Sequence, residues 1–131
     1  MEVQRRDKAV PHFYFMRINR TVALDHVDGD SQLLADLALI FLEDGPRLLG
    51  EIRDSLAKGD SAAVERTAHS LKGRLAFFGM DRERELASEL EISGRRGESA
   101  EARRLMTELA LNIETAMPEF AVLADDVDGV I

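Results

Sequence analysis

The chain has 131 residues, of which 45% are apolar and 32% are charged, and this balance fits one folded domain rather than a disordered chain. It contains no cysteine, which excludes a disulfide framework and a thiolate zinc site. Its net charge of −8 argues against binding to nucleic acid or to an anionic membrane, because both need clustered Lys and Arg side chains.

We expect no targeting signal in the N-terminal residues. Residues 1–20 contain a charged stretch at 5–8 and no long apolar run, so they do not form a signal peptide. The longest purely apolar run of the chain, residues 37–42, is far too short to span a bilayer. We therefore expect a cytoplasmic protein without a membrane partner.

An N-terminal extension precedes the main domain. We assign it to residues 1–17 and expect a helix over 2–18, interrupted or started by Pro11. The cluster Phe-Tyr-Phe-Met at residues 13–16 indicates packing, because such a group rarely stays exposed on a monomer. Packing onto the rest of the chain is favoured, which gives a monomer, and dimerisation through this extension is the alternative.

The signals that follow are helical, and no run of β-branched residues alternates as in a strand. A short helix is predicted after Thr21, a plausible N-cap, up to about Val27. Asp30 or Ser31 is then expected to cap the first of four longer helices. These are predicted over residues 31–57, 61–78 and 81–93, and from about residue 98 onward.

Turn and breaker residues separate these helices. Asp60 is the expected N-cap of the second long helix, Gly79 closes it, and Asp81 is expected to cap the third. Pro46 predicts a kink near residues 43–46, and Pro118 is expected to kink or end the last helix.

Each long helix has an apolar stripe at helical spacing. Four such helices joined by short turns predict an all-α fold, an antiparallel four-helix bundle over residues 18–125 with a tail over 126–131. The stripes are formed by Leu33, Leu34, Leu37, Phe41, Leu48, Ile52 and Leu56; by Val64, Ala68, Leu71, Leu75 and Phe78; by Leu86, Ala87 and Leu90; and by Ala102, Leu105, Leu109, Ile113 and Ala116.

The second long helix carries the most informative pattern of the chain. His69 is followed by Lys72 and Gly73, and positions i, i+3 and i+4 of a helix lie on one face. This face is opposite the apolar stripe, so His69 is expected to point outward. A lone surface histidine is usually silent, but a glycine inside a helix costs about 1 kcal/mol relative to alanine, and Gly73 therefore indicates close approach of a partner.

Small side chains surround the histidine on this face. At about 100° per residue, several neighbours lie within roughly 60° of His69, and the small ones leave the imidazole open to a large protein. The expected partner-binding residues are Ala62, Glu65, Arg66, Gly73, Ala76 and Phe77.

The motif resembles that of the histidine-containing phosphotransfer (HPt) domain family. The core is Ala-His-Ser-Leu-Lys-Gly at residues 68–73, followed by Gly79. A second block precedes it in the usual order, and the resemblance spans roughly residues 18–116. The second block comprises Gly29-Asp30-Ser31-Gln32-Leu33-Leu34, Phe41-Leu42-Glu43-Asp44-Gly45-Pro46 and Lys58-Gly59-Asp60.

The resemblance implies roles for individual residues. His69 would accept and donate the phosphoryl group, Lys72 would lie near the phosphoryl oxygens, and Gly73 would leave room for the partner. Glu91, twelve residues after Gly79, matches the position at which relatives often carry a Glu or Gln that bonds the other imidazole nitrogen. Arg74 departs from the family, which usually has a small residue there. It points inward, so it must extend to solvent or find a carboxylate.

The implied partners are a receiver domain of a response regulator and a hybrid sensor histidine kinase, in two-component signalling. We expect a carrier rather than an enzyme, because the sequence has no Gly-rich ATP-binding loop. No cofactor is expected. No metal site is expected either, since His12, His26 and His69 are scattered without ligand spacing.

Three alternatives stay open at the level of sequence. The bundle could be a docking or inhibitory module whose histidine is not phosphorylated, as Arg74 suggests. It could be the phosphotransfer segment of a larger hybrid sensor or chemotaxis-type kinase, although the start at Met1 favours a free-standing protein. It could also be a helical bundle without a phosphotransfer role.

Overall fold

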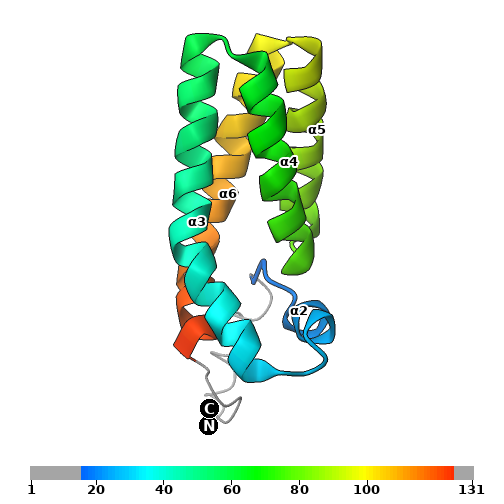
Figure 1. Cartoon of the computed structure of the whole chain (residues 1–131), viewed down its shortest axis with the longest axis vertical. Coiled ribbons are helices and arrows are strands. Elements are labelled where there is room, and N and C mark those ends of the chain that lie inside the picture. The colour runs from blue at the N-terminus through cyan, green and yellow to red at the C-terminus, as the bar shows by residue number, and fades with distance from the viewer. Residues whose placement is uncertain (1–15, 126–131) are drawn as a thin grey trace, which may run out of the picture.

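The computed structural model of the chain describes residues 16–125, and that range is helical apart from short turns. Four helices stand side by side, and a short one, α2 (Arg20–His26), lies across one end of them (Figure 1). The all-α four-helix bundle predicted from the sequence is confirmed. The expectations for residues 1–15 and 126–131 lie outside the described residues. The four long helices are α3 (Ser31–Lys58), α4 (Ser61–Phe77), α5 (Asp81–Arg96) and α6 (Ser99–Asp125).

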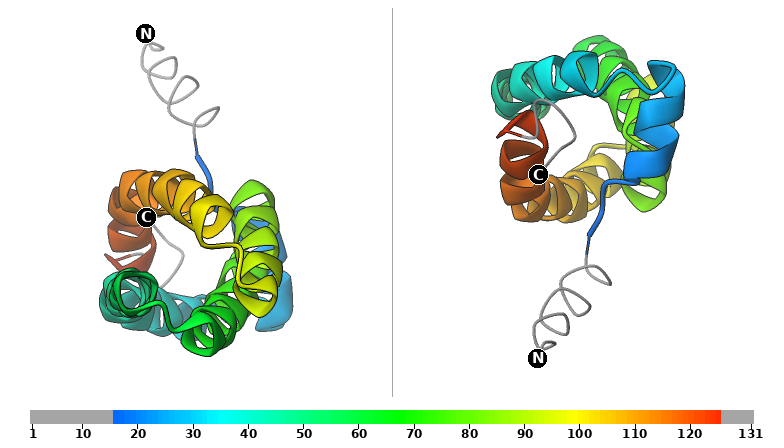
Figure 2. Two further views of the ribbon diagram at one scale, coloured as in Figure 1. Left: turned by 90° about the horizontal axis from the view of Figure 1, so that it is seen from above. Right: turned by 90° about the horizontal axis from the view of Figure 1, so that it is seen from below.

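The long helices follow one another around the bundle in chain order. Seen along the bundle axis, they occupy the corners of a square, with α4 between α3 and α5 (Figure 2). Sequential helices joined by short turns run antiparallel, which explains this order. The helix that carries the histidine motif therefore has two neighbours that can supply side chains to it.

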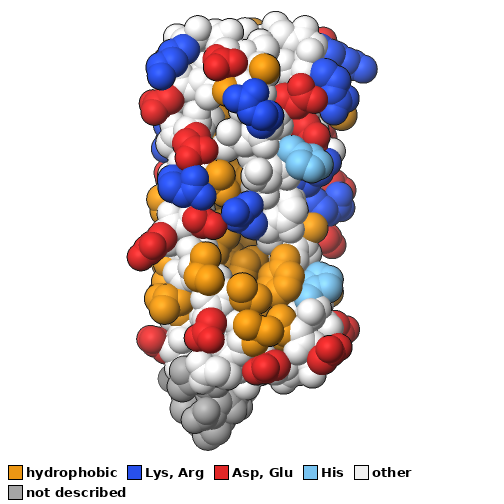
Figure 3. All heavy atoms as spheres, in the orientation of Figure 1, with side chains coloured by type: hydrophobic (Ala, Val, Ile, Leu, Met, Phe, Trp, Pro, Cys, Tyr) orange, Lys and Arg blue, Asp and Glu red, His pale blue; other side chains and the backbone are white. Residues whose placement is uncertain are grey.

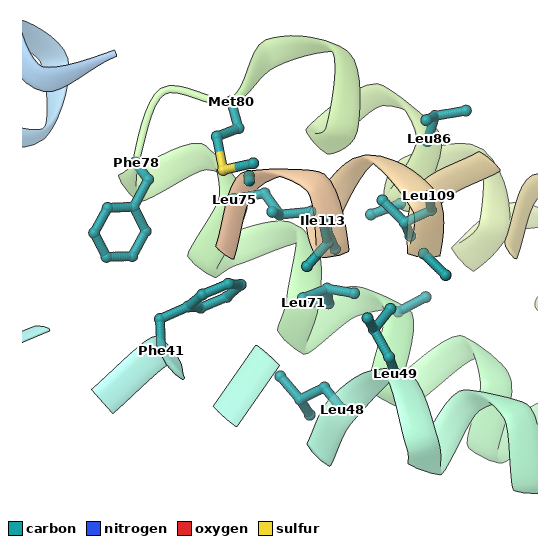
Figure 4. Packing of buried hydrophobic residues seen from close by; sticks show 14 of the residues in the cluster. Phe41, Leu48, Leu49, Leu71, Leu75, Phe78, Met80, Leu86, Leu109 and Ile113 are labelled. Atoms are coloured by element: carbon teal, nitrogen blue, oxygen red, sulfur yellow. The ribbon is translucent and has the colours of Figure 1, made fainter. Parts of the chain in front are cut away.

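The core is built by the predicted stripes of α4, α5 and α6. Every residue of these three stripes is buried, and none exceeds 3% exposure. Figure 4 shows leucines from several helices pointing into one interior, with Phe41 and Phe78 close together. Full burial of a Leu or Phe side chain contributes about 1.5–3 kcal/mol, so these stripes supply the main driving force for the fold.

The stripe of α3 is narrower than predicted. Phe41, Leu48 and Ile52 are buried as expected, but Leu33 is 42% exposed. The reason is that α3 meets the rest of the molecule along one side only, which buries the adjacent Leu34 and leaves Leu33 outside it. The helix continues through Pro46, and its N-terminal part leans toward α2 (Figure 1).

Two predicted N-caps are wrong. The cap of α2 is Asn19 rather than Thr21, and its side chain accepts a hydrogen bond of 3.1 Å from the backbone N–H of Val22. Met80 occupies the N-cap position of α5 without a side-chain bond. Asp81 instead lies in the first turn of α5, where its negative charge is favoured by the helix dipole.

Two helices are longer than predicted. The third long helix continues past residue 93 to Arg96, because the left-handed residue that ends it is Gly97, with φ of 69°. The last helix continues through Pro118 to Asp125. Pro118 is exposed, so a backbone carbonyl left without its helical donor can bond to water.

The chain enters the bundle beside α5 and α6. The backbone N–H groups of Arg17 and Ile18 donate to Oε1 of Glu119 at 2.8 and 3.0 Å. The Arg17 guanidinium lies 3.4 Å from the carboxylate of Glu83, which is 2% exposed. These contacts fix the chain just before α2. Within residues 16–125, no helix combines the length and apolar character needed to cross a membrane.

Candidate functional site

The histidine motif lies in the middle of α4. His69 follows Ala68, which is buried at 0% exposure, and the helix turns the next side chain away from the core. The His69 side chain is 67% exposed. Its imidazole therefore lies at the surface of a helix that is anchored on both sides of it by buried residues.

A carboxylate from the neighbouring helix bonds this imidazole. Oε2 of Glu91, on α5, lies 2.9 Å from Nδ1 of His69. Its other oxygen, Oε1, lies 2.7 Å from Nζ of Lys72. Because a carboxylate accepts, Nδ1 carries the proton and donates it, and the lone pair of the neutral ring is on Nε2. Sequence positions 69, 72 and 91 thus meet in one cluster.

Glu91 is the buried member of this cluster. It is 8% exposed, whereas Lys72 keeps 30% of its side chain in contact with solvent. The hydrogen bond from Lys72 holds the pKa of Glu91 below its usual value of 4.5; burial opposes this shift, and the bond from His69 adds to it. The carboxylate is therefore ionised at neutral pH.

A glycine lets α5 approach α4 closely enough for this contact. Gly94 lies one turn after Glu91, and a Cβ at this position would lie 2.9 Å from the backbone nitrogen of Glu65 and 3.0 Å from Cγ1 of Val64. Side chains do not tolerate such distances, so the two helices meet here backbone to backbone. The close approach brings Glu91 within reach of His69.

The residues expected to contact a partner differ in exposure. Gly73 is exposed, and a Cβ added there would meet nothing within 4 Å. Glu65 accepts a hydrogen bond of 3.0 Å from Arg95, which also lies 3.7 Å from Glu91. Of the remaining expected residues, Ala62, Arg66 and Ala76 are exposed, and Phe77 is half-buried.

The unusual Arg74 finds a carboxylate on α3. Its Nε donates to Oδ2 of Asp44 at 3.2 Å, and its Nη1 donates to the backbone oxygen of Ser70 at 3.0 Å. Its side chain remains 38% exposed. The inward direction expected from the helical wheel is thus accommodated by an ion pair across the boundary between α3 and α4.

A groove between α3 and α4 was not predicted from the sequence. It has a volume of about 400 Å³, and Figure 3 shows apolar side chains gathered over the lower halves of these two helices. The spacing of Leu33, Leu37 and Ile40 was the available signal, because it continues an apolar face that the core does not cover. The groove is lined by Leu37, Ile40, Phe41, Asp44, Ser70, Gly73, Arg74, Phe77 and Phe78.

In the described part of the chain, residues 16–125, no group of three or more His, Cys, Asp or Glu side chains is placed to hold a metal ion.

The exposed His69 and its bond to Glu91 define a class of protein: a helical bundle that presents one histidine on a helix surface and orients it from the next helix. Comparisons with known proteins agree with this class. The profile of the Hpt domain matches residues 36–119, and the chain belongs to this family. No curated protein matches the sequence.

A solved structure is similar over most of the chain. It is that of histidine-containing phosphotransfer protein B from Pseudomonas aeruginosa PAO1, with 26% sequence identity and a TM-score of 0.74. The similarity covers 80% of this chain and 91% of the other. Histidine phosphotransfer in a phosphorelay is therefore the general function of this domain.

Proposed function

We propose that His69 is the residue that carries the phosphoryl group, and that it exchanges this group with an aspartate of a response-regulator receiver domain. One observation carries the assignment: an exposed imidazole whose Nδ1 bonds a buried carboxylate at 2.9 Å. That bond fixes the ring and leaves Nε2 as the nucleophilic nitrogen. Phosphoryl transfer depends mainly on positioning and electrostatics, which this arrangement supplies.

Transfer to His69 forms one bond to phosphorus and breaks one. Nε2 of His69 attacks phosphorus, the bond between phosphorus and the receiver carboxylate breaks, and the carboxylate leaves as an anion. The proton on Nδ1 stays in place, so the phosphoimidazole is cationic, and Glu91 stabilises it through the same hydrogen bond. In the reverse direction, the receiver carboxylate attacks and the neutral imidazole leaves.

Lys72 has two roles in this proposal. It bonds Glu91 at 2.7 Å and is the main cause of the low pKa of that carboxyl group, so it keeps Glu91 ionised. It also lies three residues after His69 on the same face of α4, where its ammonium group offsets charge on the phosphoryl oxygens.

The surface around His69 is the proposed contact for the receiver. The small residues Ala62, Gly73 and Ala76 leave the imidazole open, and Glu65, Arg66 and Phe77 border it. We propose that a hybrid sensor kinase supplies the phosphoryl group through its own receiver. In this proposal the domain of residues 18–125 is a monomeric cytoplasmic carrier that phosphorylates nothing from ATP.

The test is transfer from a phosphorylated receiver domain to wild type and to His69→Gln. Wild type should acquire an acid-labile, base-stable phosphoryl group, and the variant should acquire none. His26→Gln is the matched control, because it removes the other described histidine from an exposed position. Label on His69→Gln, or none on wild type across several receivers that still bind, would reject the carrier and leave a docking module.

A further inference from the structure

Arg74 occupies a place where it can affect the choice of partner. It lines the groove between α3 and α4 together with Ser70 and Gly73, the residues one and four positions after His69. A protein that reaches the imidazole and covers Gly73 therefore also meets the guanidinium. Figure 3 shows Lys and Arg side chains above the apolar patch on this face.

The Arg74 guanidinium is held in place, but not all of its N–H groups are hydrogen-bonded. Nε and Nη1 are bonded to Asp44 and to the Ser70 carbonyl, while Nη2 makes no hydrogen bond within residues 16–125. A guanidinium has five N–H donors in a fixed plane, so at least two still point to the groove or to solvent. With its side chain 38% exposed, the cation is positioned in advance and remains accessible.

Asp44 does not depend on Arg74 alone. It also pairs with Arg47 at 3.0 Å, one turn further along α3, and Arg47 in turn pairs with Glu51 at 2.6 Å. Arg47 would still neutralise Asp44 if Arg74 were lost. Neutralising this carboxylate is thus a weak reason for an arginine at position 74.

We propose that Arg74 is a specificity-determining residue that selects receivers carrying a carboxylate opposite the groove. The remaining N–H groups of Arg74 donate to that carboxylate, while apolar side chains of the receiver cover Leu37, Ile40 and Phe77. A receiver with a Lys or Arg at the same place is rejected, because two cations would be buried side by side. This inference rests on the proposed phosphotransfer function.

The test compares two variants that break the same ion pair from opposite sides. Arg74→Gln removes the cation, whereas Asp44→Asn keeps it and frees it from α3. Each is assayed with several purified receiver domains that accept phosphoryl groups from the wild type, and the maximal transfer rate and KM for the receiver are determined separately. Tm is measured for both, which identifies any variant that is poorly folded.

Arg74→Gln should raise KM about tenfold for the preferred receivers, leave the maximal rate unchanged and weaken the salt dependence of transfer. Asp44→Asn keeps the cation, so it should raise KM much less than Arg74→Gln does. A charge reversal is the second experiment. The variant Arg74→Glu should regain a low KM when one surface Asp or Glu of the preferred receiver is changed to Arg. Arg53→Gln, at an exposed pair with Glu114 on another part of the bundle, is the matched control and should change nothing.

Equal increases in KM for Arg74→Gln and Asp44→Asn would overturn the inference, because they would show that the ion pair acts only by joining α3 to α4. A uniform change across all receivers, or no charge reversal that restores KM, would also overturn it. These outcomes need a wild type that transfers. If wild type transfers to no receiver, the proposed function itself fails and the inference falls with it.

Discussion

Gly73 is a helical glycine without a structural reason inside the described chain. It is exposed, nothing lies within 4 Å of the position of a Cβ, and its backbone is ordinary helix. A glycine in such a place loses more conformational entropy on folding than an alanine, and the helix is weaker for it. In the proposed function, the benefit of this glycine is the space that it leaves beside His69 for the receiver.

Gly73→Ala should raise the free energy of unfolding by about 1 kcal/mol and lower the rate of phosphoryl transfer. The added methyl group gains helix propensity, but it projects into the space beside His69. Gly50→Ala is the control, because Gly50 also lies in a helix with nothing within 4 Å and is remote in sequence from the motif. It should give the same gain in urea unfolding with normal transfer. Equal transfer by both variants would contradict a contact role for Gly73.

The Glu91 carboxylate gives the stability of the protein a pH dependence of known sign. Its pKa is lower in the folded chain than its usual value of 4.5, so folding is favoured by its ionised form. This contribution is fully present above about pH 4.5 and is lost as the pH falls through the lower, folded value.

Glu91→Gln should therefore cost about 1–2 kcal/mol at pH 7, because the charged bond to Lys72 is lost. The difference in free energy of unfolding between wild type and variant should shrink below pH 4.5, measured by urea unfolding from pH 7 to pH 3. A difference that stays constant over this range, or that grows toward acid, would contradict the ionised pair.

At the scale of elements, the site depends on how closely α5 lies against α4. The two helices are connected by Phe78, Gly79 and Met80, and Gly79 has φ of 67°. A Cβ at Gly79 would lie 2.7 Å from Cβ of Asn19, the N-cap of α2. Gly94 thus permits close contact between α4 and α5 near one end of this pair, and Gly79 lets the turn at the other end lie against α2.

Gly94→Ala should destabilise the protein by about 1–3 kcal/mol, because its methyl group would overlap with the α4 backbone at Glu65. The helices would have to separate, which lengthens the bond between His69 and Glu91. Both the loss of stability and a changed ¹⁵N shift of His69 Nδ1 should be seen. Glu89→Ala, at an exposed position of α5, should stay within about 0.5 kcal/mol of wild type. A stable variant with an unchanged shift would show that the close approach is not required.

Sequence reasoning succeeded where local pattern decides the outcome. The apolar periodicity of the helix is enough to predict that Leu71 is buried and His69 is exposed, because a helix fixes the side on which each residue lies. At helix ends it was right for Asp60, which caps α4, and wrong for α2, where Asn19 is the cap and several polar residues compete for that role. It also could not find Asp44 as the partner of Arg74, since 30 residues separate them and only the packing of α3 on α4 joins them.

At the scale of the whole molecule, three aromatic rings join helices that are far apart in sequence. The Phe120 ring of α6 lies 4.3 Å from that of Phe41 and 4.8 Å from that of Phe78, measured between centroids. Phe41 comes from α3, and Phe78 follows α4. Stacked and edge-on rings of this kind add to the free energy of area burial. The cluster therefore holds together the end of the bundle on which α2 lies.

Phe120→Ala should lower the free energy of unfolding by about 3–5 kcal/mol, a large part of the total for a domain of this size. The ring is 0% exposed, and its removal leaves a cavity that the neighbouring rings cannot close. Val122→Ala on the same helix is the control; Val122 is 66% exposed, and the change should stay within about 0.5 kcal/mol. A loss below about 1 kcal/mol for Phe120→Ala would mean that the cluster contributes little.

The bond between His69 and Glu91 has a consequence for the direction of the proposed relay. It prepares the imidazole to attack, and it prepares the phosphorylated ring to leave, because forward and reverse transfer share one transition state. The bond favours the cationic phosphorylated ring over the neutral one, so it shifts the equilibrium of each separate transfer toward phosphorylated His69. Over the complete relay, His69 begins and ends unphosphorylated, so the contribution of the bond cancels from the overall equilibrium. In such a relay the bundle transfers phosphoryl groups reversibly, and the net direction of transfer is set by the relative phosphorylation of the two receivers.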